Sequence, residues 1–242
     1  MTSVMPSILA DGAQELGIEL SKKQLEQFHR FSEVLREWAE RVSLTAVKDE
    51  EGIERRHFLE SAAILPVLAE EGLSLEDRSL IDVGSGSGVP GVPLKILVPS
   101  LQLTLVEAKQ RKVEFLTAAL PQIGLEDVTV VTRRAEEAAR NPAYREQFDF
   151  AIAKALAPLR TLAELTLPFV RMGGVVIAPK GQDAEREVKE AEVALETLKG
   201  ALRANVDLPL AQPAQRLVLL DKELPTPDRF PRRPGVPAKR PL

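Results

Sequence analysis

The stretch SLIDVGSGSGVPG, at residues 79–91, decides the fold of this chain. Its first half places Leu80 and Ile81 before Asp82, which is typical of a short buried strand that ends in a carboxylate. Its second half is rich in glycine, which lets the backbone turn sharply and approach a ligand closely. Ligands of an open parallel sheet bind beyond the carboxyl ends of its strands, so this turn is a candidate binding site.

Downstream of this stretch, short apolar runs alternate with helical stretches. Runs of strand type cover residues 79–83, 101–107, 127–131, 148–153 and 174–179. Helical stretches lie at about 91–98, 109–120, 134–140, 158–170 and 182–199. This alternation predicts βαβ units and an α/β fold with a mostly parallel sheet. Two closing runs, at 201–210 and 216–220, leave no room for a helix and predict an antiparallel hairpin at the sheet edge.

Residues before the first strand show helical spacing only. Residues 21–40 carry apolar side chains at spacings of three and four, and Ser21 with Gln24 has the pattern of a capping box. A second helix is expected at about 50–71, with Pro66 as the point where it would break.

We therefore expect three parts. A helical N-terminal extension covers residues 1–78, and a ligand-binding α/β domain covers residues 79–224. A basic, proline-rich tail covers residues 225–242 and should be extended and irregular, lying on or near the α/β domain.

The composition excludes several classes of protein. The chain has no Cys, which excludes disulfides, a thiolate nucleophile, an iron–sulfur cluster and a Cys-rich zinc site. With only two His, we expect no metal site. No apolar run approaches the roughly 20 residues of a membrane helix. The N-terminus lacks the features of a signal peptide. We expect a cytoplasmic monomer that does not contact membranes.

Charge is distributed unevenly along the chain. The net charge of −4 argues against a general nucleic-acid binder. Residues 1–78 hold nine basic and sixteen acidic residues, whereas the last 14 residues hold five basic residues and no acidic ones. If the protein meets RNA, the acidic N-terminal part is the less suitable contact face.

Two carboxylates narrow the choice of ligand for the glycine loop. Glu107 ends the second predicted strand, 23 residues after Gly84, where an acid can accept hydrogen bonds from both ribose hydroxyls of an adenosine. The segment GSGVPG, at residues 86–91, also satisfies the dinucleotide fingerprint. Three features favour S-adenosylmethionine, with Asp82 beside its methionyl part. They are the D-x-G-x-G-x-G form that begins at Asp82, Pro90 inside the loop, and the predicted hairpin. A glycine turn without any ligand is the third interpretation.

Motifs along nearly the whole chain point to one family. They are SLTA (43–46), RRHFLES (55–61), GSGSGVPGVPLKI (84–96), VEAKQRKVEFL (106–116), RRAEE (133–137), FDFAIAKALAPL (148–159), APKG (178–181) and RRPGVPAKRPL (232–242). In this order they resemble the bacterial glucose-inhibited division protein B family, whose members methylate N7 of a guanine in small-subunit (16S) ribosomal RNA. The resemblance implies a class I S-adenosylmethionine-dependent methyltransferase with a Rossmann-like, seven-stranded sheet. Its partner would be this RNA or the small ribosomal subunit.

The resemblance also implies a set of site residues. The cofactor would be bound by Asp82, Gly84, Ser85, Gly86, Gly88, Val89, Glu107, Ala108, Ala135, Glu136 and Lys154. Ala135 and Glu136 would border the adenine, with Glu136 or a nearby carbonyl accepting from its amino group. Lys154 would lie at the reaction centre and position the reactants. The family usually has Asn, Asp and Arg where this chain has Ser43, Glu60 and Lys154.

Ten basic residues are candidates for contacts with RNA phosphates. They are Lys109, Arg111, Lys112, Arg133, Arg134, Lys180, Arg232, Arg233, Lys239 and Arg240. Several follow strand ends, which places them on the cofactor side of the sheet. His57, in contrast, is expected to be a packed or hydrogen-bonded structural residue.

Other functions stay open at this point. The enzyme could methylate another RNA or a small molecule, or the protein could be a ribosome-assembly factor or cofactor sensor without catalysis. An NAD-dependent oxidoreductase would fit the glycine loop, but Tyr144 is the single tyrosine and no Y-x-x-x-K motif is present.

Overall fold

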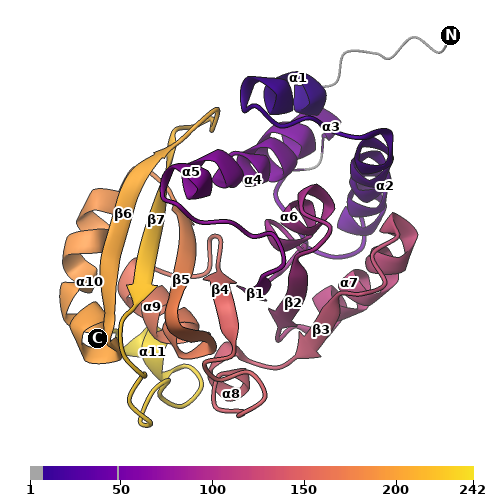
Figure 1. Ribbon diagram of the computed structural model, residues 1–242. Helices are drawn as coiled ribbons and strands as arrows, with labels where there is room; N and C mark the ends of the chain where they lie inside the picture. The colour runs from indigo at the N-terminus through magenta and orange to yellow at the C-terminus, as the bar shows by residue number, and fades with distance from the viewer. Residues whose placement is uncertain (1–7, 48) are drawn as a thin grey trace, which may run out of the picture.

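The sheet holds the five strands that the alternation predicts and the two strands of the predicted closing hairpin. The computed structural model describes residues 8–47 and 49–242, so the first seven residues of the expected N-terminal extension, and the N-terminus considered as a signal peptide, lie outside the described residues. The strands are β1 (Ser79–Val83), β2 (Gln102–Glu107), β3 (Thr129–Thr132), β4 (Phe148–Ile152), β5 (Val170–Lys180), β6 (Gly200–Leu208) and β7 (Gln215–Lys222). Their order is β3-β2-β1-β4-β5-β7-β6 (Figure 1). β1 pairs in parallel with β2 and β4, whereas β7 runs antiparallel between β5 and β6. The mostly parallel sheet and its closing hairpin are confirmed.

Helices cover both faces of this sheet. On one face lie α6 (Gly91–Leu97), α7 (Gln110–Ile123) and the N-terminal helices, which share one hydrophobic core with the strands. On the other face lie α8 (Ala135–Ala138), α9 (Leu159–Thr166) with the 3₁₀ turn η2 (Leu167–Phe169), and α10 (Ala184–Leu198). The N-terminal helices therefore form part of one layer of the fold, packed over α6 and α7 (Figure 1).

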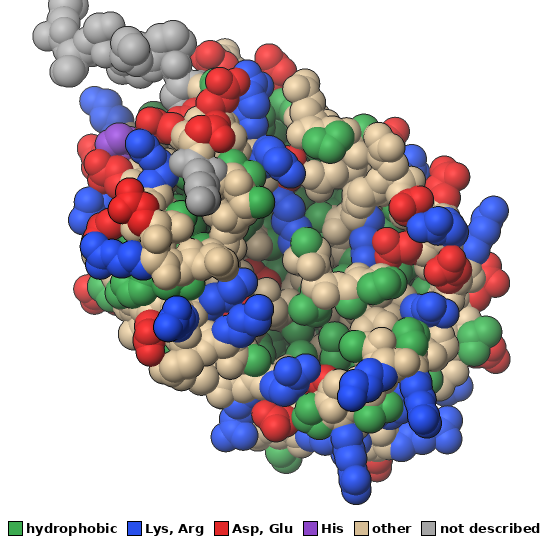
Figure 2. All heavy atoms as spheres, turned by 180° about the vertical axis from the view of Figure 1, so that it is seen from behind, with side chains coloured by type: hydrophobic (Ala, Val, Ile, Leu, Met, Phe, Trp, Pro, Cys, Tyr) green, Lys and Arg blue, Asp and Glu red, His purple; other side chains and the backbone are tan. Residues whose placement is uncertain are grey.

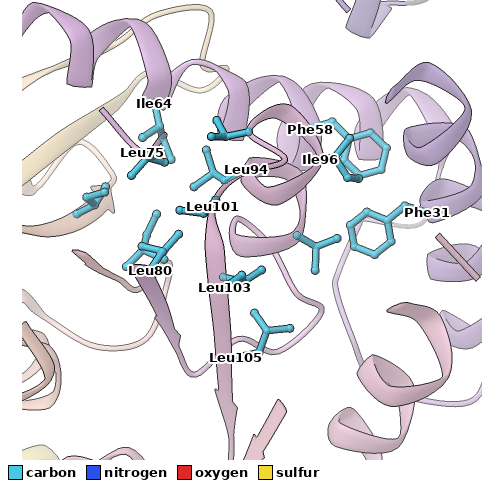
Figure 3. Packing of buried hydrophobic residues seen from close by; sticks show 14 of the residues in the cluster. Phe31, Phe58, Ile64, Leu75, Leu80, Leu94, Ile96, Leu101, Leu103 and Leu105 are labelled. Atoms are coloured by element: carbon cyan, nitrogen blue, oxygen red, sulfur yellow. The ribbon is translucent and has the colours of Figure 1, made fainter. Parts of the chain in front are cut away.

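Central strand β1 is buried on both faces. Leu80 packs in the core on the α6 side, whereas the next residue, Ile81, packs in the core on the α9 side. Figure 3 shows the first of these cores, where leucines of the sheet meet Leu94 and Ile96 of α6. Because successive side chains of a strand point to opposite faces, a strand covered on both sides is an unbroken apolar run, as Leu80-Ile81 is.

The first long helix, α2 (Lys22–Ala39), is held by its ends and by its apolar face. The Ser21–Gln24 capping box is present, as predicted. The Gln24 side chain also donates to the Ile96 carbonyl oxygen over 2.9 Å, which satisfies one of the last carbonyls of α6. The Phe31 ring stacks on the Phe58 ring, with centroids 5.5 Å apart. These contacts fasten α2 to the α/β layer.

The helix expected at 50–71 is not continuous. The structure has α3 (Glu50–Ile53), a π-helical turn η1 (Glu54–Leu59), α4 (Glu60–Ala62) and α5 (Ile64–Glu70). The break comes at Ala63, before Pro66 and not at it. Pro66 lies in the first turn of α5, where a missing N–H costs no helical hydrogen bond. A first helix, α1 (Ile8–Glu15), precedes α2.

The C-terminal tail is irregular apart from one short helix, α11 (Val236–Lys239). It lies against the α/β domain near α9, to which α11 is adjacent (Figure 1). Among the described residues, no helix has the length and apolar character that crossing a membrane requires.

Candidate functional site: a cofactor cavity at the strand ends

The glycine loop between β1 and α6 needs its glycines. Gly84, Gly86 and Gly88 adopt φ angles of 75°, 57° and 79°, a region that other residues rarely adopt. The backbone N–H groups of Gly84 and Ser85 both donate to the Val106 carbonyl oxygen, over 2.8 and 3.1 Å. A Cβ on Gly84 would lie 2.7 Å from the Leu156 side chain. The loop is therefore held close to both β2 and the segment after β4.

Asp82, in β1, stabilises the end of this loop. Its buried carboxylate accepts a hydrogen bond from the Gly91 N–H, with 3.0 Å between Oδ2 and the nitrogen. Burial, helped by the nearby charge of Glu107, raises the pKa of Asp82 to about 7. Asp82 does not line the cofactor cavity, which corrects the expectation that it lies beside the methionyl part. It fixes the start of α6 instead.

Four other predicted loop residues also lie outside the cavity lining: Ser85, Gly86, Gly88 and Val89. Ser85 is buried, and its hydroxyl donates to the Asp82 carbonyl oxygen over 2.8 Å. Gly86 donates its N–H to Glu107, as described next. The structure therefore gives Ser85 and Gly86 the task of shaping the loop, and Gly84 is the loop residue that lines the cavity.

Glu107 lies at the end of β2 in the position expected of a ribose acceptor. Its Oε2 accepts from the Gly86 N–H over 3.0 Å, and its Oε1 accepts from the Lys109 N–H over 2.7 Å. Each carboxylate oxygen has a second lone pair, so two hydroxyls can still be bound. The two N–H donors fix the carboxylate at the edge of the cavity, between the glycine loop and the chain after β2.

These elements enclose a cavity of about 400 Å³ at the carboxyl ends of the central strands. Six of the predicted cofactor residues line it: Gly84, Glu107, Ala108, Ala135, Glu136 and Lys154. Further lining residues were not predicted: Val106, Ala155, Leu156, Ala157, Thr161, Leu165, Pro237 and Ala238. The segment 155–157 directly follows a strand, which is a signal that sequence reasoning could have used. Pro237 and Ala238 carry no such signal.

Glu136 is buried, and one of its oxygens is engaged. Oε1 accepts a hydrogen bond from the Gly235 N–H over 2.8 Å, and Oε2 lies 3.5 Å from Arg134 Nε. Each oxygen keeps a second lone pair, so the expectation that Glu136 or a nearby carbonyl accepts from the adenine amino group stays a prediction. Ala135 and Glu136 both line the cavity.

Lys154 joins the cavity to the N-terminal helices. Its ammonium donates to Glu60 Oε2 over 2.7 Å and to the Arg56 carbonyl oxygen over 2.9 Å. Glu60 begins α4 and is buried, and its other oxygen, Oε1, has no hydrogen-bond partner in the part of the chain that the structure describes. Arg extends further than Lys, and Asp less far than Glu, so this pair spans a distance similar to that of the Arg and Asp usual in the family.

His57 is a structural residue, as predicted. Its Nε2 lies 2.8 Å from Thr45 Oγ1. Burial and the positive charge of Lys154 lower the pKa of His57 to about 4, so its ring is neutral at pH 7. It is not among the residues that line the cavity.

A second cavity, of about 650 Å³, adjoins the first. The two share Lys154, Ala155, Leu156 and Ala157, the segment after β4. The far side of the second cavity is formed by Arg56, by the turn after β5, and by residues 213–215 of the hairpin. Ala155 adopts a φ of 53° at the junction, a strained conformation of the kind that occurs at functional sites.

Two of the ten basic candidates, Lys180 and Arg232, are largely withdrawn from solvent by ion pairs, whereas Arg134 pairs with Glu136 and stays exposed. Lys180 is buried and lies 2.7 Å from Glu187 Oε2, and Arg232 Nη2 lies 2.5 Å from Glu164 Oε2. These pairs give both residues a structural partner, and their contact with RNA stays a prediction. The other eight have exposed or half-buried side chains, and four of them line the cofactor cavity: Lys109, Lys112, Arg133 and Arg134. Figure 2 shows Lys and Arg side chains at the rim of a hollow in the face turned away from the viewer in Figure 1.

Comparison with known proteins identifies the family. The GidB family, described as rRNA small subunit methyltransferase G, matches residues 24–220. The chain belongs to this family. It is 46% identical to Ribosomal RNA small subunit methyltransferase G of Roseiflexus sp. (strain RS-1) over 239 residues, 97% of this chain and 99% of that one. The protein of the same name from Alkaliphilus metalliredigens (strain QYMF) is 39% identical, over 97% and 98% of the two chains.

The fold has solved counterparts among methyltransferases. An S-adenosylmethionine-dependent methyltransferase from Aquifex aeolicus aligns with a TM-score of 0.51 and 18% identity, over 71% of this chain and 93% of that one. The class I methyltransferase fold is thereby confirmed. With the family established, the protein is an rRNA methyltransferase and its cofactor is S-adenosylmethionine.

The residues at the strand ends fit this cofactor. Gly84 lines the cavity, and because it has no side chain a ligand can approach its backbone closely. Glu107 offers a fixed carboxylate to the ribose. Ala108, Ala135 and Leu165 give the cavity apolar surface that suits an adenine ring. When bound, S-adenosylmethionine supplies a methyl group activated by its sulfonium charge.

Proposed function

We propose that this enzyme transfers a methyl group from S-adenosylmethionine to N7 of a guanine in 16S ribosomal RNA, either free or within the small ribosomal subunit. One observation carries the proposal. The cofactor cavity and the larger second cavity meet at residues 154–157, so a base in the second cavity would face the methyl group across this junction. The family name supports small-subunit RNA as the source of that base.

The charged groups around the junction suit a nucleophile that needs no deprotonation. The three carboxylates that line the cavities, Glu107, Glu136 and Glu187, each accept at least one backbone N–H. His57 lies outside the lining of both cavities, and its Nε2 is hydrogen-bonded to a threonine. Guanine N7 carries its own lone pair, whereas an exocyclic amine or a ribose hydroxyl must lose a proton. The arrangement therefore favours N7 over those acceptors.

Catalysis then rests on position. As N7 bonds to the methyl carbon, the carbon–sulfur bond breaks and its electron pair stays on sulfur, so positive charge moves to the guanine ring. Holding the three atoms in line contributes several kcal/mol to such a reaction. Lys154 borders the junction. Its ammonium charge is compensated by Glu60, so it repels the guanine ring less as that ring becomes positive.

Eight cations around the cavities would contact RNA phosphates: Lys109, Arg111, Lys112, Arg133, Arg134, Arg233, Lys239 and Arg240. The narrow major groove of A-form RNA hides N7, so the target guanine must lie in a loop or an irregular region. The affinity for RNA should fall steeply with salt concentration. Each phosphate contact to a single strand should add roughly 0.7 to the slope of log affinity against log salt concentration.

The test is a methyl-transfer assay with labelled S-adenosylmethionine. The acceptors are unmodified 16S RNA transcript, small subunits assembled from that transcript, and free guanosine. N7-methylguanine is identified by strand scission after borohydride and aniline treatment. We expect label in one guanine of the RNA or subunit and none in guanosine.

Two variants make the assay specific. Glu107→Ala should abolish transfer by removing the ribose acceptor, whereas Asp228→Asn, at an exposed position outside both cavities, should not change it. Label on an exocyclic amine or a ribose would contradict the N7 assignment, and absence of label in every RNA would defeat the proposal.

A further inference from the structure

The C-terminal strap, residues 226–242, is fastened along the domain by partly buried hydrogen bonds. Arg145 donates to the Thr226 carbonyl oxygen over 2.7 Å and to the Phe230 carbonyl oxygen over 2.8 Å. Arg140 donates to the Pro231 carbonyl oxygen over 2.6 Å. Basic side chains of the domain thus bind strap carbonyls, which fixes the first half of the strap.

The middle of the strap carries a bidentate ion pair. Glu164 of α9 is fully buried, and both of its oxygens accept from the Arg232 side chain, at 2.5 to 3.1 Å. Glu164 Oε1 also accepts from the Arg232 backbone N–H over 2.8 Å. Such charge-assisted, two-point contacts define both position and orientation. They direct the residues that follow Arg232 toward the cofactor cavity.

Two hydrogen bonds place the end of the strap at one side of that cavity. The Gly235 N–H donates to Glu136 Oε1 over 2.8 Å, and the Thr161 hydroxyl donates to the Pro237 carbonyl oxygen over 3.2 Å. Pro237 and Ala238 therefore line the cavity between Glu136 and α9. This is the side of β3, beyond Glu107, where the base attached to the ribose must lie.

We propose that the end of the strap, residues 235–238, is part of the cofactor site, and that Pro237 and Ala238 form the wall against which the adenine ring of S-adenosylmethionine lies. The chemistry of this wall suits a flat, apolar ring face, because it combines a proline ring and a methyl group with the nearby side chain of Leu165. Glu136 acts on the ligand through the strap: its carboxylate holds Gly235 and so sets the position of the wall.

The wall is tested by binding measurements on the full-length protein without RNA. Titration calorimetry compares S-adenosylhomocysteine with 5′-methylthioadenosine, which has the same adenosine part and lacks the amino-acid part. In Ala238→Trp, an exposed wall residue is replaced by a ring that enters the cavity. The dissociation constants of both ligands should rise at least tenfold and by similar factors, because the two ligands share the adenosine that the wall would touch.

A matched control adds the same ring elsewhere on the strap. Asp228→Trp lies at a fully exposed position outside the cavity and should bind both ligands as the unchanged protein does. A chain that ends after Pro234 keeps the Arg232–Glu164 pair and removes the wall, so it should bind both ligands more weakly with little change in its melting temperature.

Two results would overturn the proposal. One is binding of both ligands within a factor of two in the Ala238→Trp and truncated proteins. The other is a loss of affinity confined to S-adenosylhomocysteine, which would place the strap against the amino-acid part. Because no RNA is present, neither result depends on which base the enzyme methylates.

Discussion

Lys154 and Glu60 form an ion pair, with 2.7 Å between Nζ and Oε2, that joins the chain after β4 to the N-terminal helices. Glu60 is almost fully buried, whereas Lys154 keeps 21% of its side chain exposed in the lining of both cavities. The acidic N-terminal part therefore contributes to the cavity, because it supplies the counter-charge of a lysine that lines it.

Replacing Lys154 by the longer Arg and Glu60 by the shorter Asp tests this relationship. Lys154→Arg alone crowds the buried carboxylate, and Glu60→Asp alone leaves a gap, so each should lower both stability and the rate of methyl transfer. The double variant should recover most of both, with a coupling energy of about 0.5 to 3 kcal/mol by urea unfolding. Strictly additive effects would show that the two side chains act independently.

Asp82 gives the second prediction, a stability that depends on pH. The folded protein holds the pKa of this carboxyl at about 7, above its value in the unfolded chain. The free energy of unfolding is highest, as far as this group is concerned, below about pH 4, where the carboxyl is protonated in both states. It falls as pH rises to about 7, because in that range the carboxyl ionises in the unfolded state and stays protonated in the folded state. Asp82→Asn keeps an acceptor for the Gly91 N–H and removes the charge. Relative to the unchanged protein, it should gain up to about 4 kcal/mol of unfolding free energy between pH 4 and 8.

The measurement is urea unfolding of both proteins at several pH values, and the quantity compared is their difference, so that other titrating groups cancel. A difference that stays constant from pH 4 to 8 would mean that Asp82 ionises normally in the folded protein.

Gly84 gives the third prediction, in comparison with Gly72. Both adopt a positive φ, 75° and 70°, but a Cβ on Gly84 would meet Leu156 at 2.7 Å, whereas a Cβ on Gly72 would have no atom within 4 Å. Each Gly→Ala change should cost about 1 kcal/mol of stability from backbone strain. Only Gly84→Ala should also weaken S-adenosylhomocysteine binding, by at least tenfold in calorimetry. Equal binding by the two variants would remove the loop from the cofactor site.

The parts of the site that the sequence predicts are those that a parallel sheet brings together. Gly84, Glu107, Ala135 and Lys154 each lie at or just after the end of a strand, and the carboxyl ends of parallel strands meet at one edge of the sheet. The order of βα units is enough to place them, although their side chains are far apart along the chain.

The parts that the sequence does not predict depend on tertiary contacts between side chains. Lys180 and Arg232 are basic like the other candidates for RNA contacts, and only the structure shows their acidic partners, the half-buried Glu187 and the buried Glu164. Likewise, nothing in the pattern around Ala238 indicates a cavity wall, because its position follows from the Arg232–Glu164 pair earlier in the strap. Charge and periodicity describe single segments, and these roles arise between segments.

Arg232 and its neighbour Arg233 allow the two roles of a basic residue, a structural ion pair and a contact with RNA, to be tested separately. Arg232 is paired with the buried Glu164, whereas Arg233 is exposed. Arg232→Gln leaves the Glu164 carboxylate buried without its charge partner, which should cost about 3 kcal/mol of unfolding free energy. Arg233→Gln should leave stability unchanged and reduce the slope of log affinity for 16S RNA against log salt by about 0.7, the contribution of one phosphate contact. Urea unfolding and filter binding at four salt concentrations, on both variants, measure the two effects. If Arg232→Gln were as stable as the unchanged protein and weakened RNA binding in the same way as Arg233→Gln, Arg232 would belong to the RNA surface after all.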